Sequence, residues 1–203
     1  MRTIVYTTNT GSTEKYAKML SEKMGYPCYS LQDAEKKIKT GTEIIYLGWI
    51  MASEINGYRK AEKRYKIVAA CAVGMGKTGT QAAEVRAETH IADEIPLFTL
   101  QGGFDIRKLH GIYKIMMSIM VKTAGKVLAD KANRTEEEED MLDMMLHGGN
   151  RVCEENLQAI YDWCNMQKDS DERYSRTAVR TSMSNYREQE WMVNIPLWAI
   201  AEI

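Results

Sequence analysis

Short apolar runs divide the first hundred residues of the chain. Residues 43–49 (EIIYLGW) and 66–73 (KIVAACAV) are apolar almost throughout, instead of alternating with polar positions. Such a composition is typical of strands that are buried on both faces of a parallel sheet. Similar short runs at residues 3–6, 26–30 and 95–100 complete a set of five predicted strands.

Helical patterns separate these strands. A turn rich in hydroxyls and glycine precedes a helical stretch over residues 14–25, and the glycine-rich residues 74–79 precede another over residues 80–91. Strands that alternate with helices are typical of βαβ units. We therefore predict an α/β fold with a doubly wound, five-stranded parallel sheet.

The chain departs from this alternation after the fifth strand. Residues 101–149 are too many for a simple connection and contain two helical pieces of their own, so we predict an insertion there. Its second helix is expected to begin at Thr135, which can form a capping box with Glu138, and the acidic run there suits a first helical turn. An amphipathic helix over residues 151–166 then closes the domain.

The predicted domain covers residues 1–166, and residues 167–203 form a C-terminal extension. This extension starts with a polar, linker-like stretch and ends with an apolar one that contains Trp191 and Trp198. Tryptophan is enriched at protein interfaces, so the extension could pack across a partner subunit. A homodimer is therefore one expectation from the sequence.

The overall composition excludes several classes of protein. The 203 residues carry a net charge of −1, so the chain has no basic field that would attract nucleic acid. The four cysteines lack metal-ligand spacing, and we interpret them as reduced thiols with no metal site. Because no signal peptide and no apolar run of about 18 residues is recognisable, we expect a cytoplasmic protein.

The strongest chemical signal lies between the first strand and the first helix, where residues 7–13 read TTNTGST. A helix N-terminus presents unpaired N–H groups and a positive dipole end, and a glycine lets the backbone curl closely around a phosphate. The candidate phosphate-binding residues are Thr8, Asn9, Thr10, Gly11, Ser12 and Thr13. On spacing alone, a hydroxyl-rich helix cap is an equal alternative.

The pattern T-x-T-G-x-T, formed by Thr8, Thr10, Gly11 and Thr13, resembles the FMN-phosphate signature of flavodoxins. The order of the predicted elements is similar to that family over residues 1–166. The resemblance implies a flavodoxin-like fold that holds FMN non-covalently at the end of its first strand.

The same resemblance implies that the flavin ring lies between the loops after the third and fourth strands, at the carboxyl edge of the sheet. The candidate residues are Trp49, Ile50, Met51 and Ala52 in one loop and Gly74, Met75, Gly76 and Lys77 in the other. Trp49 would either stack on the ring or belong to the core. Residues 50–53 depart from the pattern of flavodoxin carriers, since they include no glycine whose peptide could flip beside flavin N5.

A competing interpretation treats Gly76, Lys77 and Thr78 as the end of a nucleotide-binding P-loop. The complete pattern needs a glycine where this chain has Cys71. On the flavodoxin interpretation, Lys77 is either a solvated loop charge or a group that balances the reduced flavin anion.

The insertion carries a second resemblance, over residues 100–126 (LQGGFDIRKLHGIYKIMMSIMVKTAGK). This stretch is similar to one in the menaquinone-dependent protoporphyrinogen dehydrogenases, where an aromatic-basic loop leads into a methionine-rich helix. The matching features here are Gly102, Gly103, Arg107, Lys108, Tyr113 and residues 116–125. The resemblance implies an insertion that covers the flavin edge and meets a substrate or a membrane quinone.

Two further interpretations of this insertion remain open. Its methionines would equally suit a packed helix face, because methionine fills gaps in cores. Its lysines would suit an anionic membrane surface, which makes peripheral membrane contact an expectation. These lysines are Lys108, Lys114, Lys122 and Lys126.

The function predicted from these features is that of an FMN-dependent oxidoreductase that acts on a porphyrinogen or a quinone. The flavin, and no side chain, would be the reactive group. The alternative is a flavodoxin-type electron carrier that docks on a redox partner through complementary charge, although the near-neutral net charge favours the enzyme. A third hypothesis, a binding module that has lost its flavin, is opposed by the intact phosphate loop.

Overall fold

The computed structural model describes residues 2–109, 111–170 and 173. It divides the chain into two units, Met1–Tyr161 and Asp162–Ile203. In the second unit the described residues, 162–170 and 173, are helical. The predicted contact of Trp191 and Trp198 with a partner subunit lies outside the described residues, and the predicted boundary after residue 166 stays a prediction.

Five parallel strands form the centre of the first unit, in the order β2-β1-β3-β5-β6. They are β1 (Thr3–Tyr6), β2 (Cys28–Ser30), β3 (Glu43–Met51), β5 (Lys66–Gly74) and β6 (Leu97–Gln101). The order changes direction next to β1, as it does in other doubly wound sheets. The predicted α/β fold with a five-stranded parallel sheet is thereby confirmed.

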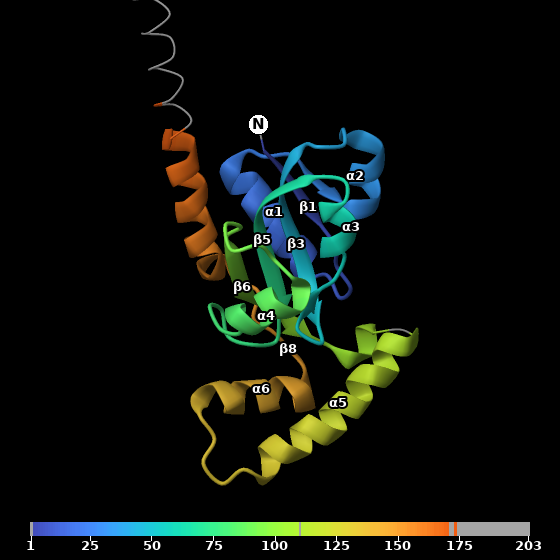
Figure 1. The fold of residues 1–203 in the computed structure, drawn as a ribbon. Coiled ribbons are helices and arrows are strands. Elements are labelled where there is room, and N and C mark those ends of the chain that lie inside the picture. The colour runs from blue at the N-terminus through green and yellow to red at the C-terminus, as the bar shows by residue number, and fades with distance from the viewer. Residues whose placement is uncertain (1, 110, 171–172, 174–203) are drawn as a thin grey trace, which may run out of the picture. The chain divides into compact units, whose positions relative to one another are not determined.

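Helices cover both faces of this sheet (Figure 1). They are α1 (Ser12–Met24), α2 (Leu31–Lys37), α3 (Tyr58–Glu62) and α4 (Ala82–Thr89). On one face, the side chains of Ile44 and Tyr46 join a buried cluster with residues of α2, α3 and α4. Side chains alternate along a strand, so Ile45 and Leu47 are directed to the other face, and both are fully buried. Helix α1 contacts β1, β2 and β3.

Local sequence explains how α1 is placed. It buries Tyr16, Ala17, Leu20 and Met24, which recur along one side of the helix. It ends at Gly25, whose left-handed conformation (φ 69°) favours glycine, and the Gly25 N–H donates to the carbonyl of Ser21. The helix therefore starts immediately after the loop of residues 7–11 and lies against the centre of the sheet.

The insertion forms two helices beyond the carboxyl end of the sheet (Figure 1). Its elements, in chain order, are β7 (Gly103–Phe104), the 3₁₀ helix η1 (Ile106–Lys108), α5 (Gly111–Asp130), α6 (Glu136–His147) and β8 (Gly149–Asn150). The antiparallel pair β7 and β8 joins the two ends of the insertion. The predicted capping box is confirmed, because Thr135 Oγ1 accepts from Glu138 N and Glu138 Oε2 accepts from Thr135 N.

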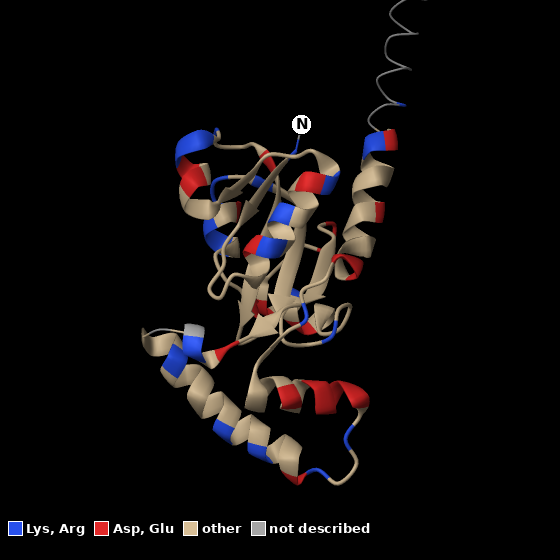
Figure 2. Ribbon diagram, turned by 180° about the vertical axis from the view of Figure 1, so that it is seen from behind, with Lys and Arg blue, Asp and Glu red and all other residues tan. Residues whose placement is uncertain are grey.

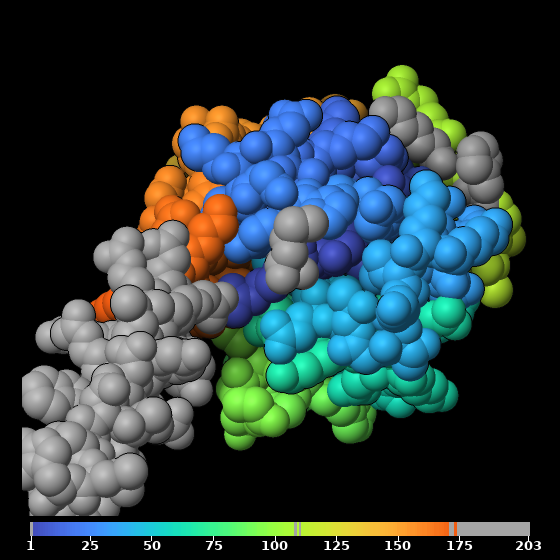
Figure 3. Space-filling model, turned by 90° about the horizontal axis from the view of Figure 1, so that it is seen from above, coloured from blue at the N-terminus to red at the C-terminus, as the bar shows by residue number. Residues whose placement is uncertain are grey.

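Figure 3 shows the first unit from the end opposite the insertion, where the N-terminal part of the chain, coloured blue, forms much of the surface. After β8, the 3₁₀ helix η2 (Glu154–Leu157) leads into helical residues 158–170. No helix among the described residues has both the length and the apolar character needed to span a membrane.

Candidate functional site

A cavity of about 450 Å³ lies at the carboxyl end of the sheet. Its lining comes from the loops after β1, β3, β5 and β6 and from both helices of the insertion. The volume falls within the range of about 300–1,000 Å³ that is usual for cofactor and small-molecule sites. Ligands of doubly wound sheets bind at this edge, so the cavity is the candidate functional site.

The structure brings most of the predicted site residues together around this cavity. Every one of them lines it except Gly11 and Lys77. Gly11 is the N-cap residue of α1 and lies in the chain between the lining residues Thr10 and Ser12. Lys77 is exposed. The role of these residues in binding a ligand stays a prediction.

The loop after β1 leaves the first turn of α1 without a side-chain cap. Its N-cap residue is Gly11, whose φ of 95° favours glycine and whose missing side chain cannot cap the helix. The alternative of a hydroxyl cap is therefore wrong. Thr8 Oγ1 instead accepts from Gly11 N (3.1 Å) within the loop, and Ser12 Oγ accepts from Gly103 N (3.0 Å).

Thr10 and Thr13 are the hydroxyls that the loop does not use. Neither forms a hydrogen bond with any described residue, and both line the cavity. Thr13 is almost fully buried at the cavity wall, whereas Thr10 is half-buried. Together with the uncapped N–H groups, these two hydroxyls form a neutral cradle of the kind that binds phosphate at helix N-termini. The residues present therefore fit the phosphate of an FMN.

The base of this loop is anchored to the neighbouring strand. Thr7 Oγ1 and Tyr46 Oη both donate to the carbonyl oxygen of Asn56, at 2.7 and 2.8 Å. Burial raises the pKa of Tyr46, so its hydroxyl stays protonated as a donor. A Cβ at position 57 would collide with the Tyr46 hydroxyl. The close approach of the backbone at position 57 to this hydroxyl therefore requires glycine.

The predicted loop after the third strand is a hairpin. Strand β3 continues past Trp49 to Met51 and pairs with the antiparallel strand β4 (Glu54–Ile55). Ala52 and Ser53, at φ 49° and 62°, form its turn in the left-handed conformation that two-residue hairpins need. Non-glycine residues adopt that conformation at an energetic cost, which means that the turn is held by the pairing around it.

Trp49 belongs to the cavity and not to the core. It is partly buried, and its ring meets that of Tyr113 on α5 edge to face, with centroids 5.3 Å apart. The side chain is thus available to a ring that enters the cavity. Stacking on a flavin stays a prediction.

The loop after β5 is tied to β6. Gly102 N donates to Gly74 O (2.7 Å), Gln101 N to Thr78 Oγ1 (2.9 Å) and Gly79 N to Thr99 O (3.1 Å). Helix α4 starts only at Ala82, whereas a P-loop passes directly from its Lys-Thr pair into a helix. The P-loop interpretation does not fit this geometry.

Methionines of the insertion form the opposite wall of the cavity. Those that line it are Met116, Met117, Met120, Met141 and Met145. Met144 is fully buried beside Phe104 and Leu109, so the insertion also has a core of its own. Met117 of α5 packs against this core, as the packed-face interpretation expects. Coverage of a flavin edge by these methionines stays a prediction. No lysine or arginine lines the cavity among the described residues.

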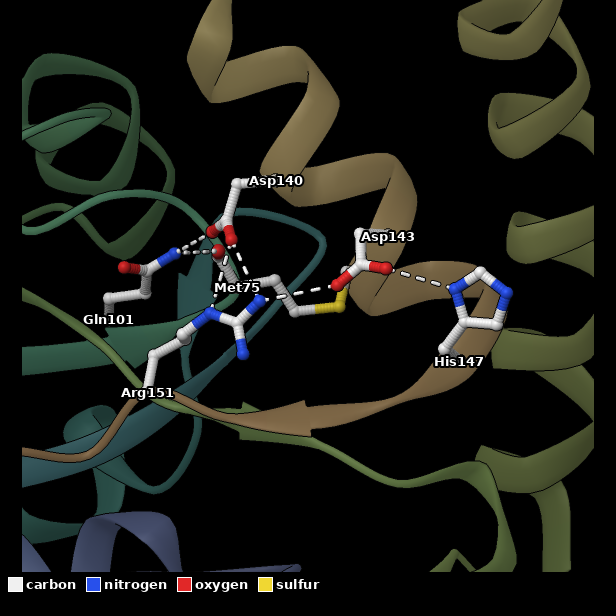
Figure 4. A network of polar contacts seen from close by, with 6 residues as sticks. All are labelled: Met75, Gln101, Asp140, Asp143, His147 and Arg151. Atoms are coloured by element: carbon white, nitrogen blue, oxygen red, sulfur yellow. Dashed lines mark hydrogen bonds and ion pairs between the residues drawn. The ribbon is translucent and has the colours of Figure 1, made fainter.

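A polar network fastens α6 to the sheet (Figure 4). Arg151 donates to Asp140 Oδ1 through Nε (3.1 Å) and Nη2 (2.9 Å). Gln101 Nε2 donates to Asp140 Oδ2 (2.6 Å) and to the carbonyl of Met75 (3.4 Å). The acidic residue on α6 thereby joins β6, the loop after β5 and the segment after β8, and it fixes the wall that α6 contributes.

The network continues to the C-terminal turn of α6. Asp143 accepts from His147 Nδ1 (2.9 Å) and from Arg151 Nη2 (3.3 Å). These two groups, His147 first, hold the pKa of Asp143 below its ordinary value. The sequence does not reveal the roles of Gln101, Asp140 and Arg151, because no local motif marks residues that meet across the fold.

The fold and the cavity define a doubly wound α/β protein with a candidate ligand site at the switch in strand order. A family model of the flavodoxin domain matches residues 3–128, which include all five parallel strands and most of α5. The chain therefore belongs to the flavodoxin domain family, and this supports a flavin-binding redox function. No curated protein matches the chain closely enough to count as a relative.

Proposed function

We propose that the protein binds FMN in this cavity and catalyses oxidation or reduction of an uncharged ring of the quinone class. The observation that carries the proposal is the continuity of the cavity from the hydroxyl-rich loop after β1 to the methionine wall of α5 and α6. A site of this form covers a bound ring on the side that a small electron carrier leaves open.

Each part of the cavity has a separate task in this proposal. Thr10, Thr13 and the uncapped N–H groups of α1 hold the phosphate. Residues 49–52 and 74–76 flank the ring, with Trp49 as the aromatic surface. Bound FMN would supply the hydride or electron transfer, and the protein supplies position and an apolar environment that excludes water.

The lining favours a quinone over a porphyrinogen. Porphyrinogens carry carboxylates, which need cationic or hydrogen-bonding partners when they leave water. No basic side chain lines the described cavity, and Arg107, close to the lining residue Leu109 in the chain, is already paired with Asp105. Methionine and aromatic side chains suit a flat apolar ring. Relationship to the protoporphyrinogen dehydrogenases is thus proposed for the architecture of the insertion, with a different preferred substrate.

Anaerobic reduction of the FMN-loaded protein, followed by visible absorption, tests this function. We expect retained flavin that passes to the two-electron reduced form without a stable radical and is reoxidised by a water-soluble naphthoquinone. A stable radical together with slow quinone reoxidation would assign the protein to the electron carriers that dock on a redox partner. Failure to retain FMN would leave a flavodoxin-shaped binding module.

A further inference from the structure

A stripe of large apolar side chains runs along α5 on the side away from the insertion's core. Ile112, Ile115 and Ile119 recur at helical spacing and are 66%, 62% and 57% exposed. Val127 continues the stripe at 72%. Soluble surfaces rarely gather so many large apolar residues in one place, so the stripe indicates an interaction surface.

Positive charge accompanies this stripe. Lys114, Lys122 and Lys126 are exposed on the same helix, and none of them has an ion-pair partner within the described part of the chain. No acidic residue occurs on α5 before Asp130, its last residue. Figure 2 shows the complementary arrangement on α6, whose first turn carries four glutamates. The insertion therefore separates charge between its two helices.

We infer that the exposed face of α5, defined by Ile112, Ile115, Ile119 and Val127 with Lys122 and Lys126, docks on an anionic lipid bilayer. Apolar residues on one helix face bordered by lysines are the arrangement by which helices lie in a membrane interface. The lysines attract anionic headgroups, and the isoleucines enter the boundary with the acyl chains. The acidic α6 would be repelled, which sets the orientation.

Composition favours lipid over a protein partner. Protein interfaces are enriched in arginine and tryptophan and depleted of lysine. Helix α5 has three lysines, no arginine and no tryptophan, and its Tyr113 lines the cavity. The whole chain has a net charge of −1, so attraction to an anionic surface depends on the local charges of α5.

The docking face reaches the cavity. Met116 is 43% exposed beside the isoleucines and also lines the cavity. Under the proposed function, on which this step rests, a lipid-soluble quinone could enter from the bilayer past Met116 without crossing water. The docking itself needs no flavin and no quinone, so the two proposals can fail separately.

Flotation with lipid vesicles tests the inference on the full-length protein, with and without added FMN. We expect the protein to float with vesicles of equal parts phosphatidylcholine and phosphatidylglycerol, and to stay behind with phosphatidylcholine alone. Ile115→Gln with Ile119→Gln should abolish flotation, because both side chains are already exposed and their replacement leaves the fold intact. Circular dichroism verifies that the variant is folded.

Charge variants test whether vesicle binding depends on the lysines of α5 or on the positive charge of the protein in general. Lys122→Gln and Lys126→Gln together should weaken binding about 25-fold, since each lysine near the membrane changes it by roughly fivefold. Lys15→Gln and Lys36→Gln remove the same charge from exposed positions on the first unit and should leave binding nearly unchanged. Equal losses in both double variants, or no flotation of the wild type, would overturn the inference.

A second copy of the chain is the other candidate for the partner of this stripe. Light scattering of the protein without vesicles tests whether the chain forms a dimer. We expect the mass to be unaffected by Ile115→Gln with Ile119→Gln. A dimer that these substitutions convert to a monomer would assign the stripe to a second copy of the chain and overturn docking on lipid.

Discussion

At one end of the cavity the loop after β1 presents hydroxyls and backbone N–H groups, whereas at the other end α5 and α6 present methionine side chains. The first end is held by strands that are buried in the sheet, and the second by a polar network and a small core of its own. One cavity thus has a polar end with strict geometry and an apolar end with adaptable side chains. Under the proposed function, the polar end binds the phosphate of the cofactor and the apolar end selects the second substrate.

The largest expected effect comes from substitutions at the polar end of the cavity, in the loop after β1. Thr10→Ala together with Thr13→Ala should weaken FMN binding by about 3 kcal/mol or more, because a hydrogen bond to a charged group contributes about 1.5–3 kcal/mol. Equilibrium fluorescence titration measures the affinity. Riboflavin, which lacks the phosphate, is the control ligand, and its affinity should hardly change. An equal loss for both ligands would remove the phosphate assignment from this loop.

The next largest effect is expected at the apolar end of the cavity, where Arg151 holds α6 in place. Arg151→Met leaves Asp140 and Asp143 without their shared partner and should lower the free energy of unfolding by about 1–2 kcal/mol. Urea denaturation measures this difference. Lys131→Met, which breaks the exposed pair with Glu138, is the matched control and should cost less than about 1 kcal/mol. If the two variants are equally stable, the network does not hold α6 in place.

A smaller effect is expected at the turn of the β3–β4 hairpin, where Ala52 and Ser53 adopt the left-handed conformation. Ala52→Gly should raise stability by up to about 1 kcal/mol, because the left-handed conformation costs a non-glycine residue about 1–2 kcal/mol, offset in part by glycine's greater chain entropy. Ala83→Gly, in the exposed part of α4, should lower it by about 1 kcal/mol. Thermal unfolding shows whether each variant is more or less stable than the wild type. Destabilisation by Ala52→Gly would contradict the strain assigned to the turn.

The smallest effect concerns pH. Since the pKa of Asp143 is held below its ordinary 3.8, this carboxylate contributes stability above that value and loses it as the pH falls further through the folded pKa. His147→Asn removes the principal cause, so the decline of the thermal midpoint in this acid range should become shallower. Nuclear magnetic resonance of the Asp143 carboxyl should show its pKa rising toward the ordinary value in the variant. An unchanged pKa would assign the lowering to Arg151 instead.

The two ends of the cavity also differ in how far the sequence predicts them. Uniformly apolar runs such as residues 44–47 mark strands buried on both faces, and each strand then delivers the loop that follows it to the same edge. The Thr135 cap was equally predictable, because its partner Glu138 is three residues away. Short-range patterns were therefore sufficient for the sheet and for the polar end.

The remaining parts depend on contacts between distant residues or on turns without their usual signal. Ala52 and Ser53 offer no glycine or asparagine, so the extension of β3 and its pairing with β4 had no sequence mark. Gln101, Asp140 and Arg151 meet only after the insertion has folded back. From the sequence, the acidic run at the start of α6 is explained by the helix dipole alone, although Asp140 within it also pairs across the fold.

The two-residue strands β7 and β8 have a consequence for how such proteins diversify. Gly103 pairs with Asn150 and Phe104 with Gly149. The chain therefore enters and leaves the insertion at the same place, where these two short strands pair. The parallel sheet is complete without this segment, so a change in its length need not move any of the five strands. Under the proposed function, the insertion is the part of the protein in which substitutions can alter the substrate while the loop after β1 stays the same.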